Sequence, residues 1–104
     1  MDESPQQFIY FLRPTRLEML TEGPTAEETR LQAEHGSYLA RLAAHDVVML
    51  AGRTTTNDAN TVGIVIINAA DEGAAREIME RDPFVKNSIM NVTLFPFRVA
   101  YRGK

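Results

Sequence analysis

The residues "FIYFL" (Phe8–Leu12) and "TVGIVIIN" (Thr61–Asn68) are two short runs rich in aromatic and β-branched side chains. Side chains of these types favour β-strands. A run that is apolar at consecutive positions is typical of a strand buried on both faces. We therefore predict that these two segments form the central strands of a sheet, around which the other elements are arranged.

Two more strands are predicted, "VVMLAG" (Val47–Gly52) before the polar turn "RTTTNDAN", and "NVTLFPFRVAY" (Asn91–Tyr101) near the end of the chain. Pro96 lies within the last of these segments. Because proline has no N–H to donate, it is tolerated in a strand mainly at the edge of a sheet. We therefore expect the last strand at an edge.

Two helices are predicted, and the first begins where Thr25 and Glu28 form the pattern of a capping box. Side chains suited to a buried face then recur at helical spacing, at Leu31, His35, Tyr38, Leu39 and Leu42. This predicts a helix over Ala26–Ala44, after a long loop over Arg13–Thr25. Asp71 is expected to cap a second helix over Glu72–Arg81, which ends before Pro83 because proline disfavours helical geometry in the preceding residue.

The resulting order, β-α-β-β-α-β, is the ferredoxin-like arrangement of the α+β class, and the 104 residues are expected to form a single domain. Two helices cover one face of a four-stranded antiparallel sheet. Since both central strands are apolar on both faces, the other face would be a large exposed apolar patch in a monomer. We therefore expect a homodimer that packs sheet against sheet.

The amino-acid composition excludes several classes of binding partner and of functional site. The net charge is −3 and no basic cluster occurs, which argues against nucleic acid or an anionic membrane as the partner. Cysteine is absent, so disulfides and thiolate catalysis are excluded. The acidic start "MDESPQQF" has no apolar segment typical of a signal peptide, and the apolar runs are too short to span a bilayer. We expect a cytoplasmic protein.

Four segments together resemble the YciI-like (YCII-related) family: "FLRP", "EHGSYLARLAAHDVVMLAG", "GIVIINAADEGAAREIMERDPFV" and "VTLFPFRVA". The resemblance implies a dimeric α/β barrel of ferredoxin-like protomers. It also implies an active site built around a histidine and an aspartate, which correspond to His35 in "HGSYL" and Asp82 in "DPFV". The first loop, with "TRLEML", and the hairpin "RTTTNDAN" differ from the usual family pattern, and we expect both to shape the pocket.

His35 and Asp82 each have a structural and a functional interpretation. A histidine on the buried stripe of a helix is often only a core residue bonded to a backbone carbonyl, and Asp before proline is common in turns. In the functional interpretation Asp82 accepts a hydrogen bond from one ring nitrogen of His35 and raises the basicity of the other. An imidazole ordinarily titrates near pH ~6.5 and suits general acid/base work.

Four residues are candidates for binding the substrate. Arg13 and Arg53, each at the end of a strand, could hold an anion, although a surface salt bridge is the alternative. The Tyr38 ring is expected to pack in the protein, and its hydroxyl could donate a hydrogen bond in the pocket. Phe84 either fills space in the core or stacks on the substrate. Gly36 either admits close approach of a chain or ligand, or is simply tolerated.

The sequence therefore predicts an enzyme that uses His35 and Asp82 for general acid/base chemistry on a small anionic or aromatic metabolite, of lyase, isomerase or hydrolase type. No cofactor is expected. A metal site is not expected either, because His45 is interpreted as a surface residue and no third ligand accompanies the two histidines. The alternatives are a non-catalytic module that binds a small ligand or a protein, and a cofactor-free monooxygenase.

Overall fold

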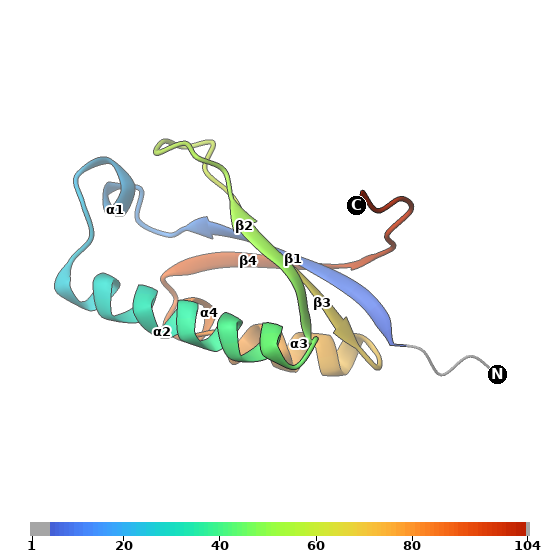
Figure 1. Cartoon of the computed structure of the whole chain (residues 1–104). Helices are drawn as coiled ribbons and strands as arrows, with labels where there is room; N and C mark the ends of the chain where they lie inside the picture. The colour runs from blue at the N-terminus through green and yellow to red at the C-terminus, as the bar shows by residue number, and fades with distance from the viewer. Residues whose placement is uncertain (1–4, 104) are drawn as a thin grey trace.

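The chain folds into a four-stranded sheet with its helices packed on one face, as described for residues 5–103 by a computed structural model (Figure 1). Residues 1–4 of the start "MDESPQQF", on which the expectation about a signal peptide rests, lie outside those residues. In chain order the elements are β1 (Gln6–Pro14), α1 (Glu18–Thr21), α2 (Ala26–Ala44), β2 (Val48–Arg53), β3 (Gly63–Ala69), α3 (Glu72–Glu80), α4 (Pro83–Lys86) and β4 (Met90–Phe97).

The sheet has the predicted topology, with strand order β2-β3-β1-β4 and antiparallel pairing throughout. The two apolar runs form the central pair, in which Tyr10 lies opposite Val65. Pro96 is in β4 at the edge, opposite Phe8. The strand bounds differ from the prediction, since β1 continues to Pro14 and β4 ends before Arg98.

Helix α2 spans the predicted residues, and its capping box is complete. The Thr25 hydroxyl accepts a hydrogen bond from the Glu28 N–H at 3.1 Å, while the Glu28 carboxylate accepts one from the Thr25 N–H at 2.8 Å. The same carboxylate forms an ion pair with the Arg16 guanidinium, in which Oε1 lies 2.6 Å from Nη2. This ion pair connects the loop between β1 and α2 to the start of the helix. That loop is not wholly irregular, because it contains the short helix α1.

The segment after α3 is a correction to the prediction. Asp71 caps α3 as expected, but a second short helix, α4, follows where only a turn was predicted. Asp82 is its N-cap and accepts a hydrogen bond from the Phe84 N–H, while Pro83 occupies the first turn. Proline suits that position because its φ is already helical and the N–H it lacks would have no partner there.

The core lies between the sheet and the helices. Successive side chains of a strand point to opposite faces, so Phe8, Tyr10 and Leu12 of β1 face the helices and are buried. Ile9 and Phe11 point to the other face, where no helix lies (Figure 1). Large apolar side chains remain exposed on that side, with Phe95 at 47%. No helix among the described residues is long and apolar enough to cross a membrane.

Candidate active site

The buried carboxylate of Asp82 is the centre of the site. Asp82 has no exposed surface, although it sits at the junction between α3 and α4. Its Oδ1 accepts a hydrogen bond from the Phe84 N–H at 3.0 Å and lies 2.7 Å from Nδ1 of His35. Its Oδ2 accepts a hydrogen bond from the Tyr10 hydroxyl at 2.9 Å. Segments from the sheet, from α2 and from α4 thus meet at one side chain.

These partners determine the protonation pattern of the pair. The Phe84 N–H is necessarily a donor. The Tyr10 phenol is one as well, because burial, followed by the charge of Asp82, raises its pKa far above the usual range. A carboxylate that accepts from several donors is stabilised in its ionised form. His35 therefore donates a hydrogen bond from Nδ1 to Asp82, and in the neutral form of the imidazole the lone pair is on Nε2.

The Nε2 atom of His35 is accessible. The imidazole stacks on the Phe84 ring, with centroids 4.2 Å apart and planes 18° apart, so its plane is fixed. Within the described part of the chain every buried polar side-chain atom has a hydrogen-bond partner. Nε2 of His35 has no hydrogen-bond partner among those residues, so it is not one of the buried atoms. The His35 side chain keeps 17% of its surface exposed. The ring is thus oriented by Asp82 and Phe84 and open on its basic side.

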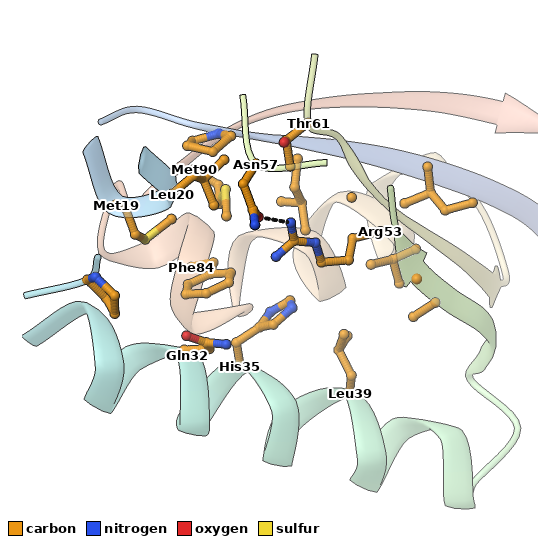
Figure 2. Close-up of a pocket in the computed structure, with 18 of the residues that line it drawn as sticks. Met19, Leu20, Gln32, His35, Leu39, Arg53, Asn57, Thr61, Phe84 and Met90 are labelled. Carbon is orange, nitrogen blue, oxygen red and sulfur yellow. Dashed lines mark hydrogen bonds between the residues drawn. The ribbon is translucent and has the colours of Figure 1, made fainter. Parts of the chain in front are cut away.

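His35 opens onto a cavity of about 500 Å³ (Figure 2). Its wall is mostly apolar, with Met19 and Leu20 from the first loop and Met90 from β4. The polar side chains on it are Gln32, His35, Arg53, Asn57 and Thr61, and no carboxylate is among its lining residues. Both segments that differ from the usual family pattern contribute to this wall, as predicted.

The structure brings some of the candidate residues together and leaves others apart. Arg53 and Phe84 line the cavity with His35, whereas Arg13 and Tyr38 do not. Arg13 follows Leu12 and precedes Pro14, which both line the cavity, so strand alternation turns its side chain to the opposite face of the sheet. It is exposed there and points away from the cavity that His35 lines.

The Tyr38 hydroxyl serves the packing of two helices. It donates a 2.6 Å hydrogen bond to the Ile78 carbonyl of α3, and partial burial, followed by the charge of Asp82, raises its pKa. Gly36 is exposed, and a Cβ placed on it would meet no atom within 4 Å, so no close approach within the protomer requires it. His45 is an exposed C-cap residue, as predicted.

Two residues of the site were not predicted, Tyr10 and Gln32. Tyr10 lies in the most buried strand, and a hydroxyl in such a run must find a partner inside the protein. That signal was available in the sequence, but the identity of the partner was not. Gln32 lies one turn before His35 on α2 and reaches the same cavity. No group of three His, Cys, Asp or Glu side chains in residues 5–103 could hold a metal ion.

Comparisons with known proteins agree with this architecture. The model of the YCII-related domain family matches residues 12–98. No curated protein matches the sequence. A similar solved structure is the 5-chloro-2-hydroxyhydroquinone dehydrochlorinase TftG of Burkholderia phenoliruptrix with 2,5-dihydroxybenzoquinone, which is 21% identical, with a TM-score of 0.63, over 88% of this chain and 93% of that one. SnoaB, a cofactor-independent oxygenase of Streptomyces nogalater, is 10% identical with a TM-score of 0.48 over 97% of both chains. At 21% identity, the likeness to TftG concerns the fold alone.

Proposed function

We propose, from the premise that this chain belongs to the YCII-related domain family, that it is an acid/base enzyme acting on a small molecule. The observation that carries the proposal is the 2.7 Å contact between His35 Nδ1 and Asp82 Oδ1, with Nε2 free at a cavity wall. A histidine oriented by a buried carboxylate is an arrangement that suits general base catalysis. This pair needs no cofactor to move a proton.

In the proposed reaction His35 Nε2 accepts a proton from the substrate and becomes an imidazolium. The buried Asp82 carboxylate stabilises that charge through the Nδ1–H hydrogen bond. The imidazolium then returns the proton to another atom of the substrate or to a leaving group. Elimination and isomerisation follow this sequence, and hydrolysis differs only in that His35 takes the proton from the attacking water, so we propose a lyase, isomerase or hydrolase.

A mostly apolar cavity suits an aromatic or similarly flat metabolite. TftG has a similar fold, and it is named as a dehydrochlorinase of a chlorinated hydroxyquinol. Hydroxylated benzoquinones and hydroquinones are therefore the first compounds to test. We also propose that a second copy of the chain covers the open face of the sheet, because Phe95 and its apolar neighbours on that face are exposed in one protomer.

The proposal is tested by a thermal-shift screen of small metabolites on the wild type and on His35→Gln. His45→Gln is a matched control, because His45 is an exposed residue at the end of the same helix. Each compound that stabilises the wild type is then incubated in D₂O, and NMR follows the loss of substrate protons or the appearance of product. We expect chemistry with the wild type and His45→Gln, and none with His35→Gln.

Other outcomes assign the chain differently. A compound that stabilises the wild type and His35→Gln equally, with no chemistry in either, would make the protein a ligand-binding module of the same fold. Turnover that persists in His35→Gln at the rate of the wild type would contradict the role given to His35.

A further inference from the structure

The guanidinium of Arg53 is held in place by the hairpin that follows β2. Its Nε donates to the Thr54 carbonyl at 2.9 Å, and its Nη2 donates to the Thr56 carbonyl at 2.6 Å and to Oδ1 of Asn57 at 2.8 Å. A guanidinium has five N–H donors in one plane. Three of them are thus used on the hairpin, which fixes the plane of the group.

The hairpin itself is built to stay in this shape. Thr61 is buried, and its hydroxyl donates to the Thr56 carbonyl at 2.7 Å and accepts from the Asp58 N–H at 3.2 Å. The Thr54 hydroxyl accepts from the Val62 N–H at 3.1 Å. These bonds place the Thr56 carbonyl where Arg53 uses it, so the cation is positioned before any ligand arrives.

The charge of Arg53 is not neutralised by the protein. Its partners are two carbonyls and an amide, and no carboxylate in residues 5–103 forms an ion pair with it. By contrast, Arg16, Arg30 and Arg76 each pair with a glutamate. The two N–H groups of Nη1 have no partner in the described part of the chain. Arg53 thus brings an uncompensated cation to a cavity whose wall carries no carboxylate.

We infer that Arg53, held by its hairpin, is the site that binds an anionic oxygen of the substrate, and that the substrate is a small ring compound with a carboxylate, phenolate or enolate group. The apolar wall would contact the ring, and the Nη1 edge would hold the oxygen through charge-assisted hydrogen bonds. This inference rests on the proposed function for its catalytic part, but not for binding.

The position of Arg53 relative to His35 connects binding to chemistry. Figure 2 shows the two side chains projecting into the cavity from β2 and from α2. When Nε2 of His35 takes a proton, the C–H or O–H electron pair stays on the substrate and is delocalised onto its oxygen. The new N–H bond makes the imidazole cationic, and Arg53 stabilises the oxyanion that forms.

The test compares matched ligands that differ in charge but hardly in shape: benzoate with benzamide, and salicylate with salicylamide. Binding to the whole chain is measured by NMR titration near neutral pH, where salicylamide is uncharged, and at millimolar ligand. We expect both anions to bind more tightly than their amides. Arg53→Gln should weaken the binding of the anions about ten- to a hundredfold and leave the amides nearly unchanged. Arg53→Lys should keep part of the preference, since the charge remains.

Arg76→Gln is the control, because Arg76 is an exposed arginine on α3 outside the cavity. Amides that bind the wild type as tightly as the anions would overturn the inference, and so would an unchanged preference in Arg53→Gln or no binding of either anion. If Arg53→Gln does not fold, the preference of the wild type and its loss with added salt decide the question. His35→Gln separates the two proposals: it should lose turnover but keep the preference for anions.

Discussion

The Tyr10 hydroxyl donates a 2.9 Å hydrogen bond to Oδ2 of Asp82, and neither residue has any exposed surface. The contact joins a central strand of the sheet to the start of α4, 72 residues further along the chain. It also occupies the carboxylate oxygen that His35 does not contact. The orientation of Asp82 toward His35 therefore depends on a core residue that does not line the cavity.

We predict that Tyr10→Phe lowers the free energy of unfolding by about 1–3 kcal/mol, because it leaves one oxygen of a buried carboxylate without a partner. Urea denaturation measures this loss. The rate of the proposed reaction should also fall, because Asp82 gains freedom to turn away from His35. The matched control is Tyr38→Phe, which removes a hydroxyl bonded to a neutral carbonyl at a half-buried site. A loss of stability in Tyr10→Phe no greater than in the control would contradict the role given to Tyr10.

Asp82→Asn should fold normally and lose most of its activity. The amide oxygen can still accept from the Phe84 N–H, and the amide nitrogen can donate to the Tyr10 hydroxyl. The negative charge that stabilises the His35 imidazolium is gone, so we expect a fall in rate of about 10²–10⁴-fold. The measurement is the rate with whichever substrate the metabolite screen identifies, together with a thermal melt.

Asp71→Asn is the control for this variant, because Asp71 caps α3 in the same way and does not line the cavity. It should keep the activity of the wild type. Equal activity of Asp82→Asn and Asp71→Asn would end the idea of a catalytic pair.

The ion pair between Arg16 and Glu28 predicts that the stability of the fold depends on pH in the acidic range. The hydrogen bond from Arg16, followed by that from the Thr25 N–H, lowers the pKa of Glu28 from an ordinary 4.5 to about 2. A carboxyl whose pKa is lowered by folding stabilises the protein above its unfolded pKa, and this contribution is lost as the pH falls through the folded pKa. Glu28→Gln should therefore melt several degrees below the wild type at neutral pH.

The two proteins should converge in thermal stability as the pH falls from about 4.5 toward 2, which melting curves at several pH values would follow. The control is Glu27→Gln, an exposed neighbour in the same turn of α2. A difference between the wild type and Glu28→Gln that stays constant down to the lowest pH would show that the contact between Arg16 and Glu28 does not depend on the charge of Glu28.

Local signals predicted the fold well. The capping box and the spacing of apolar residues gave α2 its observed bounds, and the two apolar runs gave the central strands. The contact between His35 and Asp82 was predicted from a family resemblance, since helical spacing alone favoured a core histidine. It is confirmed as a contact, at 2.7 Å, while its catalytic role stays a prediction.

Other parts of the site depend on information that a local pattern does not contain. Tyr10 was predicted only as part of a buried strand, because its partner, Asp82, lies 72 residues further along the chain. Arg13 was expected to reach the cavity from the end of the first strand, because that strand was predicted to stop at Leu12. With β1 extended to Pro14, alternation turns Arg13 away from the cavity. The hydrogen bonds that make Arg53 a fixed cation depend on the folded shape of the hairpin, and its composition alone shows only that it is polar.

The open face of the sheet predicts that this chain is a dimer in solution, and that Phe95→Asp converts it to a monomer. Phe95 is 47% exposed in the protomer and packs edge-on against Phe11, so a carboxylate there would be buried without a partner in a dimer but solvated in a monomer. Sedimentation at micromolar concentration measures the mass, and circular dichroism confirms that the variant is folded.

Leu17→Asp is the control, since Leu17 is also exposed, at 41%, but lies in the first loop. This variant should stay dimeric. A wild type that sediments as a monomer would refute the pairing of sheet faces.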